Sequence, residues 1–215
     1  MRIDPRRLHG LYAITPEEPD TPRLAERVAA AVAGGARLVQ YRAKRAGTTL
    51  ALEQARALVQ VCREGGALLV VNDSPQLARA SGADGVHLGR EDGSVAAARA
   101  VVGHAIVGVS CYADPGLALA AAREGADYVG IGSVFASPTK PGAARAPLAA
   151  LRQARAAGLP VAAIGGIDAT NAREAVAAGA DMLAVISALF EAPDVRAAAR
   201  DIAAAFDERN PSSHV

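Results

Sequence analysis

Gly125-Ala126-Asp127-Tyr128-Val129-Gly130-Ile131 is the stretch that decides the fold, because its Gly-Ala-Asp step followed by apolar residues recurs along the chain. Two further copies begin at Gly82 and Gly179, and a variant with arginine in place of the aspartate begins at Gly35. Each copy follows an alanine-rich helical pattern. We interpret each one as a helix that ends at glycine, a tight turn, and then a buried strand.

Short apolar runs alternate with helical patterns along the whole chain. Four of the runs belong to the repeat, and four more lie between its copies. The predicted strands are residues 11–15, 38–41, 68–72, 85–88, 106–110, 128–131, 161–165 and 182–185. Such alternation favours parallel strands, and eight strand–helix units predict an α/β fold with a single closed (β/α)8 TIM barrel. An open, doubly wound sheet is the alternative.

Length and composition favour one domain. The chain has 215 residues, of which 51% are hydrophobic and 21% charged, so it can bury a core. Aromatic residues make up only 3%, so small side chains must fill much of that core. We predict a barrel domain over residues 1–207 and a disordered tail over residues 208–215. Thr21 is expected to cap one helix, and Pro147 to open another that Gly158 closes.

Charge and hydropathy exclude several classes of function. A net charge of +1 gives no reason to bind nucleic acid or an anionic membrane. No apolar run approaches the roughly 18 residues of a spanning helix, and the first residues contain no apolar signal core. Cys62 and Cys111 have neither metal-ligand nor redox spacing, which favours reduced thiols. We therefore expect a cytoplasmic protein with small-molecule partners, and leave a homo-oligomer open.

Cationic side chains follow the second predicted strand, at the barrel end that carries the active site in this fold. Gln40, Arg42 and Lys44 alternate along the chain, so they can face the same direction. Two cations in that position indicate an anionic ligand, because arginine can bind phosphate oxygens with two parallel hydrogen bonds. A solvated basic loop is the alternative.

Two carboxylates follow neighbouring predicted strands. Asp73 comes after the third strand and Asp92 after the fourth. Because neighbouring strands lie roughly 4.8 Å apart, both carboxylates could reach one Mg²⁺ that also binds a substrate phosphate. A general acid–base pair is a second interpretation. A third is that Asp73 only caps the helix that begins near Ser74-Pro75.

Other strand ends carry weaker signals. Ser110 ends the fifth strand, and His87 lies inside the fourth, where we expect a core histidine bonded to a carbonyl. The loop 132–142 follows the sixth strand and carries hydroxyl groups and Lys140, so it could close over phosphate or be an ordinary surface loop.

The last two strands end in a pattern typical of phosphate binding. Gly165-Gly166 follows the seventh strand and Ile186-Ser187 the eighth. These two loops commonly form the phosphate site of such barrels, and glycine lets backbone N–H groups approach an anion closely.

The candidate residues therefore divide into two halves. The half suited to a metal-bound pyrophosphate contains Asp73, Asp92, Arg42, Lys44 and Lys140. The half suited to a single phosphate contains Gly166, Ile186 and Ser187. Two phosphorylated substrates that meet in one barrel indicate a group transfer with pyrophosphate as the leaving group.

Taken in order, these motifs resemble the thiamine-phosphate synthase family. The resemblance extends from residues 11–15 to residues 186–188, and its most specific segments are 71–73 and 85–92, with 139–140 and 163–167 in addition. It implies that hydroxymethylpyrimidine diphosphate loses pyrophosphate while the ring nitrogen of a thiazole phosphate attacks the methylene carbon. Thiamine phosphate is the product, and CO₂ is also lost when the thiazole carries a carboxylate.

The resemblance also implies roles for individual residues. The implied contacts of the pyrimidine diphosphate are Gln40, Tyr41, Arg42, Ala43, Lys44, Asn72, Ser110 and Lys140. The implied contacts of the thiazole phosphate are Ser137, Pro138, Thr139, Gly166, Ile186 and Ser187. Asp73 and Asp92 would hold one Mg²⁺ per subunit. The catalytic residues would be Arg42, Lys44, Ser110 and Lys140, which stabilise the departing pyrophosphate without a protein nucleophile.

Two departures from the family pattern leave this chemistry intact. Ala43 stands where glutamate is frequent, and Ser137 where threonine is usual. Neither change removes a charge that the metal or pyrophosphate needs. The alternatives are a thiazole tautomerase-like relative, a regulator that binds thiamine phosphate without catalysis, and another phosphate-binding barrel isomerase. The paired aspartates beside two cations argue against all three.

Overall fold

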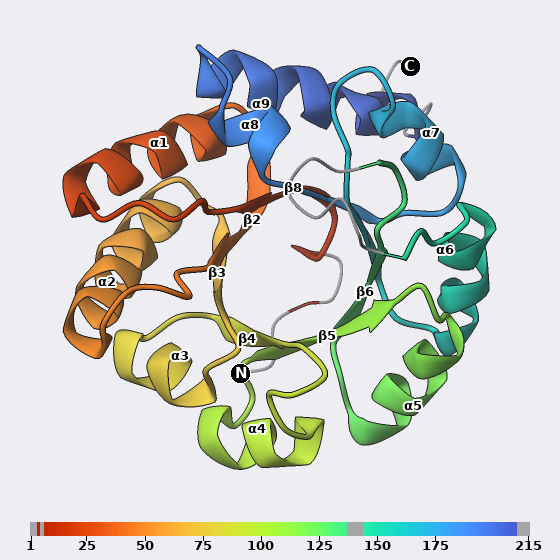
Figure 1. Cartoon of the computed structure of the whole chain (residues 1–215), viewed down its shortest axis with the longest axis horizontal. Helices are drawn as coiled ribbons and strands as arrows, with labels where there is room; N and C mark the ends of the chain where they lie inside the picture. The colour runs from red at the N-terminus through yellow and green to blue at the C-terminus, as the bar shows by residue number, and fades with distance from the viewer. Residues whose placement is uncertain (1–3, 5–6, 137–143, 210–215) are drawn as a thin grey trace.

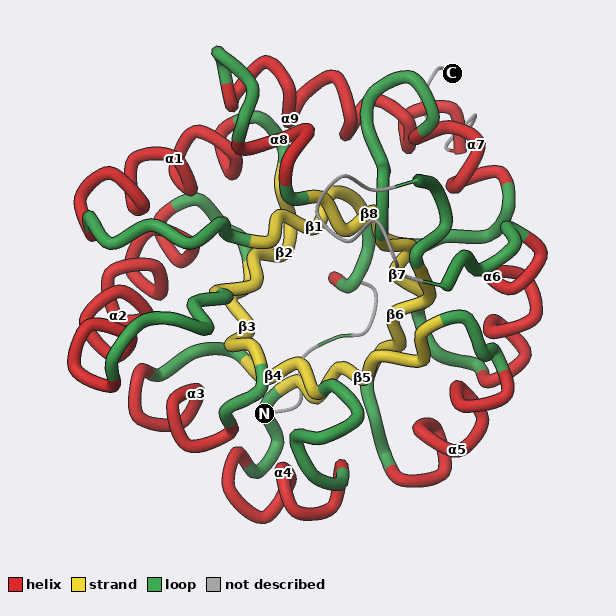
Figure 2. Tube along the Cα trace, in the orientation of Figure 1, coloured by secondary structure: helices red, strands yellow, loops and turns green. Residues whose placement is uncertain are grey.

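The computed structural model describes residues 4, 7–136 and 144–209. Eight parallel strands close into one barrel in the order of the sequence, surrounded by helices (Figure 1, Figure 2). The strands are β1 (Gly10–Ile14), β2 (Ala36–Tyr41), β3 (Leu68–Asn72), β4 (Gly85–Leu88), β5 (Ile106–Tyr112), β6 (Tyr128–Gly132), β7 (Val161–Ile164) and β8 (Met182–Val185). The predicted TIM barrel is confirmed. The open-sheet alternative is wrong, because β1 pairs with β8.

Helices connect successive strands on the outside of the barrel. They are α1 (Thr21–Ala33), α2 (Thr48–Glu64), α3 (Pro75–Ser81), α4 (Val95–Val102), α5 (Gly116–Glu124), α6 (Ala149–Ala154), α7 (Ala172–Ala177), α8 (Ser187–Phe190) and α9 (Val195–Ala203), with 3₁₀ turns η2 (Arg155–Ala157) and η3 (Ala204–Arg209). No helix among the described residues is both long and apolar enough to cross a membrane. The boundary at residue 207 stays a prediction, since residues 210–215 lie outside the described part.

Two predicted helix starts need correction. Asp20, rather than Thr21, caps α1, because its carboxylate accepts a hydrogen bond from Arg23 N at 2.8 Å. Thr21 is the first helical residue, and its hydroxyl donates to Glu53 instead. The helix expected to open at Pro147 begins two residues later, at the start of α6.

The Gly-Ala-Asp repeat forms a two-way bridge between neighbouring strands. Each aspartate immediately precedes an even-numbered strand, and its carboxylate accepts from a backbone N–H of the strand before, at 2.8 to 3.0 Å. Its own N–H donates to the carbonyl oxygen of that same residue at 2.8 Å. The three pairs are Asp84 with Leu69, Asp127 with Val107, and Asp181 with Val161. The repeat therefore fixes the relative positions of strand starts.

Asp127→Ala is expected to lower the free energy of unfolding by about 2 kcal/mol, because it leaves the Val107 N–H without its acceptor. Asp127 also binds Arg99, so that guanidinium loses a partner as well. Urea denaturation measures the effect. Asp201→Ala is the control, because it breaks an exposed ion pair with Arg200 and should cost less than about 0.5 kcal/mol. Equal losses in the two variants would contradict the bridging role.

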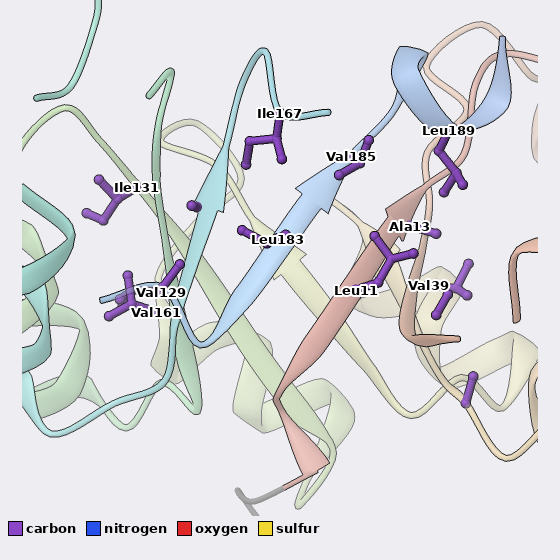
Figure 3. Packing of buried hydrophobic residues seen from close by; sticks show 14 of the residues in the cluster. Leu11, Ala13, Val39, Val129, Ile131, Val161, Ile167, Leu183, Val185 and Leu189 are labelled. Atoms are coloured by element: carbon purple, nitrogen blue, oxygen red, sulfur yellow. The ribbon is translucent and has the colours of Figure 1, made fainter. Parts of the chain in front are cut away.

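The buried apolar side chains form two layers. The larger layer lies between the barrel and its helices, and Figure 3 shows part of it, including Leu11 of β1, Val129 of β6 and Leu183 of β8. Many of its helical residues are alanines, as the composition predicts. The smaller layer fills the inside of the barrel and includes Tyr12 and Tyr128. This inner layer is the floor on which the polar site rests.

Candidate active site

A cavity of about 660 Å³ opens at the carboxyl ends of the strands. Its wall includes side chains or backbone from every strand or the loop that follows it. The residues that the sequence predicted and that line this cavity are Gln40, Arg42, Asn72, Ser110, Gly166, Ile186 and Ser187. Segments from both ends of the chain thus meet at one site, which sequence spacing alone does not show.

A chain of hydrogen-bonding side chains crosses the cavity floor. Gln40 Nε2 donates to the Tyr12 hydroxyl, which lies 2.7 Å from the Tyr128 hydroxyl. The Tyr128 hydroxyl lies 2.9 Å from His87 Nδ1, and His87 Nε2 lies 2.9 Å from Ser110 Oγ. These five residues come from five strands. This hydrogen-bond network therefore fixes the orientation of Gln40 and Ser110, the two members that were predicted to contact substrate.

Burial sets the protonation states of the side chains in this hydrogen-bond network. It raises the pKa values of the Tyr12 and Tyr128 phenols far above their ordinary value, so both are protonated at neutral pH. It lowers the pKa of His87 to about 4, so the imidazole is neutral. The expectation that His87 bonds a carbonyl is wrong, because both ring nitrogens face hydroxyl groups. The floor therefore offers polar groups without net charge.

Strand alternation is the signal by which Tyr12 could have been placed in the site. Tyr12 and Tyr128 stand in apolar runs, where they pass as ordinary core residues. Strand alternation places Tyr12 on the same face as Ile14, which lines the cavity. Their hydroxyls meet across the barrel, a contact between residues 116 positions apart.

Lys44 and Asp73, which do not themselves line the cavity, form an ion pair next to the lining residues Arg42 and Asn72. Lys44 Nζ lies 3.1 Å from Asp73 Oδ2. Asp73 adopts a φ of 65°, a left-handed conformation that is uncommon outside glycine. The helix-cap interpretation of Asp73 is wrong, because Ser74 caps α3 by accepting from Leu77 N at 3.1 Å. The carboxylate of Asp73 is thereby left to the site.

Asp92 brings a second carboxylate close to that of Asp73. Its Oδ2 accepts a hydrogen bond from Gly89 N at 2.7 Å, which orders the loop after β4. Partial burial raises the pKa of Asp92, and a hydrogen bond with Asp73 and the charge of Asp73 raise it further. The two carboxylates are therefore neighbours, and their mutual repulsion suits a site for a cation.

The segment after β2 alternates in direction. Arg42 lines the cavity, whereas the Tyr41 side chain is buried on the opposite side and donates to Gln54 Oε1 at 2.8 Å. Ala43 packs against the outer apolar layer. Because alternate strand residues face opposite ways, a contact of Tyr41 or Ala43 with substrate would have to come from the backbone, and it stays a prediction.

The glycine turn after β7 forms the other side of the cavity. Gly165 and Gly166 have φ values of 101° and 64°. The Gly166 carbonyl accepts from Asn171 Nδ2 at 2.8 Å, which anchors the turn to the start of α7. The cavity also includes Asp168 and Glu191, which the sequence did not single out. The predicted contacts that lie outside the described residues are Ser137, Pro138, Thr139 and Lys140.

A closed barrel with a polar cavity at the carboxyl ends of its strands, cations beside paired carboxylates and a glycine turn is typical of TIM-barrel enzymes acting on phosphorylated small molecules. Residues 11–189 match the family model described as thiamine monophosphate synthase. The chain belongs to this family, and the resemblance drawn from its motifs is confirmed.

Individual relatives agree with that assignment. Thiamine-phosphate synthase of Chromobacterium violaceum is 53% identical over 95% of this chain and 100% of its own length. That of Thiobacillus denitrificans is 54% identical over 90% of this chain and 92% of its own length. The structure of thiamine phosphate pyrophosphorylase from Pyrococcus furiosus superposes with a TM-score of 0.86 at 39% identity, covering 95% of this chain and 98% of that one. The chain is thus a transferase of this family.

Proposed function

We propose that this chain joins a hydroxymethylpyrimidine diphosphate to a thiazole phosphate and releases pyrophosphate. The observation that carries the proposal is a single cavity with a cationic side chain at one end and a glycine turn at the other. Arg42 lines one end, beside the Lys44–Asp73 pair, and the Gly165–Gly166 turn and Ser187 line the other. A transferase needs two such ends to bring two phosphorylated substrates together.

The reaction exchanges one bond to the methylene carbon of the pyrimidine for another. The carbon–oxygen bond breaks, and the pyrophosphate leaves with the electron pair. The thiazole ring nitrogen then donates its electron pair to the same carbon. An electron-donating aminopyrimidine stabilises the carbocation between these events, so the protein needs no nucleophile. When the thiazole carries a carboxylate, CO₂ is also lost.

The residues at the first end fit a magnesium ion. Within the described residues, no three His, Cys, Asp or Glu side chains cluster as a metal site. Asp73 and Asp92 offer two carboxylates. The remaining ligands of a Mg²⁺ ion would be substrate oxygens and water, which is a common arrangement for this ion. When bound, Mg²⁺ neutralises charge on the departing pyrophosphate.

The chain's own groups stabilise and orient the substrates. Arg42 and Lys44 bind the diphosphate and offset the charge that develops as it leaves. Ser110, held by His87, donates or accepts at the cavity floor. Gly166, Ile186 and Ser187 bind the thiazole phosphate and direct its nitrogen toward the methylene carbon. The free thiols of Cys62 and Cys111 agree with action in the cytoplasm.

Purified protein mixed with both substrates and Mg²⁺ is expected to form thiamine phosphate and pyrophosphate in equal amounts. EDTA in place of Mg²⁺ should stop both. Chromatography of the two products measures the result. Absence of product from folded protein that still binds thiazole phosphate would favour the tautomerase-like or regulatory alternative.

Ser187→Ala is expected to raise the KM for thiazole phosphate by about tenfold, because one hydrogen bond to a charged group is lost. The KM for the pyrimidine diphosphate should remain within about twofold, since Ser187 lies at the other end of the cavity. Steady-state kinetics with each substrate varied in turn measures both constants. An effect confined to the pyrimidine substrate would reverse the assignment of the two ends.

A further inference from the structure

Two consecutive glutamates in the loop between β1 and α1 bind different segments: Glu17 the segment after β2, and Glu18 two arginines of α1. We propose that Glu17 and Glu18 are positioning residues that separately hold the diphosphate end and the thiazole phosphate end. This inference rests on the proposed function for the identity of those ends. Figure 1 shows why one loop can serve both: α1, which follows it, lies between α2 on one side and α8 and α9 on the other.

Glu17 binds the segment that carries the two cations. Its Oε1 accepts from Lys44 N at 2.8 Å and its Oε2 from Arg45 N at 3.4 Å. Oε1 also lies 3.9 Å from Arg42 Nη1, and the side chain is 23% exposed. One carboxylate therefore fixes the backbone on both sides of Lys44 and lies close to the guanidinium.

Thr15, two residues before Glu17, strengthens the same connection. Its side chain is completely buried, and its hydroxyl accepts from Arg42 N at 2.9 Å and donates to Arg42 O at 3.3 Å. Thr15 and Glu17 together thus bind four backbone groups of the cationic segment, two of Arg42 and one each of Lys44 and Arg45. Glu17 is the member of this set that could affect substrate binding through both backbone position and charge.

Glu18 is connected to α8, which begins at the other end of the cavity, through an arginine side chain of α1. Its carboxylate is only 10% exposed and its Oε2 lies 3.3 Å from Arg23 Nε and 3.7 Å from Arg27 Nη1. Arg27 in turn donates to the Phe190 carbonyl, and its guanidinium lies 5.5 Å from the centre of the Phe190 ring. Phe190 ends α8, which begins at Ser187 in the cavity wall.

The main chain of the loop is itself anchored, so the two side chains can act independently. Gln54 Nε2 of α2 donates to the Glu18 carbonyl at 2.7 Å. Thr21, at the first position of α1, donates its hydroxyl to Glu53 Oε1 at 2.6 Å. Truncating one glutamate therefore leaves the path of the loop held by these contacts, and the other glutamate keeps its partners.

The test compares the KM values for the two substrates in two variants, which should have opposite effects. Glu17→Ala is expected to raise the KM for the pyrimidine diphosphate about tenfold and to leave that for thiazole phosphate within about twofold. Glu18→Ala is expected to do the reverse. Glu17→Gln, whose amide oxygen can still accept from Lys44 N, should restore most of the affinity. Glu26→Gln, an exposed carboxylate of α1, is the control for the loss of charge.

Calorimetry with magnesium pyrophosphate gives a readout that does not depend on turnover. Glu17→Ala should weaken its binding about tenfold, and Glu18→Ala should not change it. If the native protein forms no thiamine phosphate, the proposed function fails, and the calorimetry still decides the role of Glu17. If the native protein is active but both variants raise the same KM, or only lower the melting temperature, the separate positioning roles are overturned.

Discussion

Asp92→Ala is expected to lower kcat by about a hundredfold or more at saturating substrates. Its carboxylate lies beside that of Asp73, at the end of the cavity assigned to the diphosphate. Without it, one of the two protein ligands for a cation is missing, and the charge of the departing pyrophosphate is less well compensated. Binding of thiazole phosphate should change little, because the residues proposed to bind it follow β7 and β8, whereas Asp92 follows β4.

The same substitution is expected to cost little stability. Asp92 loses one hydrogen bond, from Gly89 N, which is worth about 1 kcal/mol. Removal of one carboxylate also relieves its repulsion with Asp73, which offsets part of that cost. The side chain is partly exposed and belongs to neither apolar layer. Activity and stability should therefore separate, as expected for a binding residue.

A matched variant makes the comparison specific. Asp114 follows β5 as Asp92 follows β4, and its carboxylate also accepts one backbone hydrogen bond in its own loop, from Gly116 N at 2.8 Å. Asp114→Ala should reproduce the small loss of stability with turnover nearly unchanged. Turnover against Mg²⁺ concentration and thermal melting measure the two effects. Unchanged turnover of Asp92→Ala with a large fall in melting temperature would show a structural role instead.

The strands could be predicted because their signals are local. The Gly-Ala-Asp repeat marks strand starts, and its aspartates bond to backbone groups that any parallel neighbour provides. Alternation along a strand also predicts that Arg42 faces the cavity. The same rule turns the Tyr41 side chain away from the cavity, so a substrate contact at this position would come from the backbone.

The remaining features depend on contacts between distant segments. Tyr12, His87 and Tyr128 meet inside the barrel although they come from strands that do not pair with one another. The sequence pattern does not show which side chains of such strands face each other. Glu17 belongs to no recognisable sequence motif, and its proposed positioning role comes from the neighbouring loop that it binds. Sequence reasoning therefore locates groups at the correct end of the barrel, whereas the pairs that hold them in place require the folded chain.

Gly166→Ala is expected to lower kcat/KM for thiazole phosphate by about a hundredfold. A β-carbon at this position would lie 2.1 Å from the Ala136 carbonyl oxygen, far inside contact distance, and φ is 64°. The turn after β7 would have to move away from the loop after β6, and its N–H groups would move with it. Because the phosphate contact proposed here is made by backbone groups, no rotamer change can restore their positions.

Gly158→Ala separates the two causes of that loss. Gly158 also has a left-handed φ, 73°, but a β-carbon there would meet no atom within 4 Å. It should therefore show only the conformational cost, about 1 kcal/mol of unfolding free energy, with normal kinetics. Gly166→Ala should cost about 3 kcal/mol, because steric overlap adds to the same strain. Equal stability losses with unaltered kinetics in both variants would mean that close backbone approach at Gly166 is not what shapes the phosphate end.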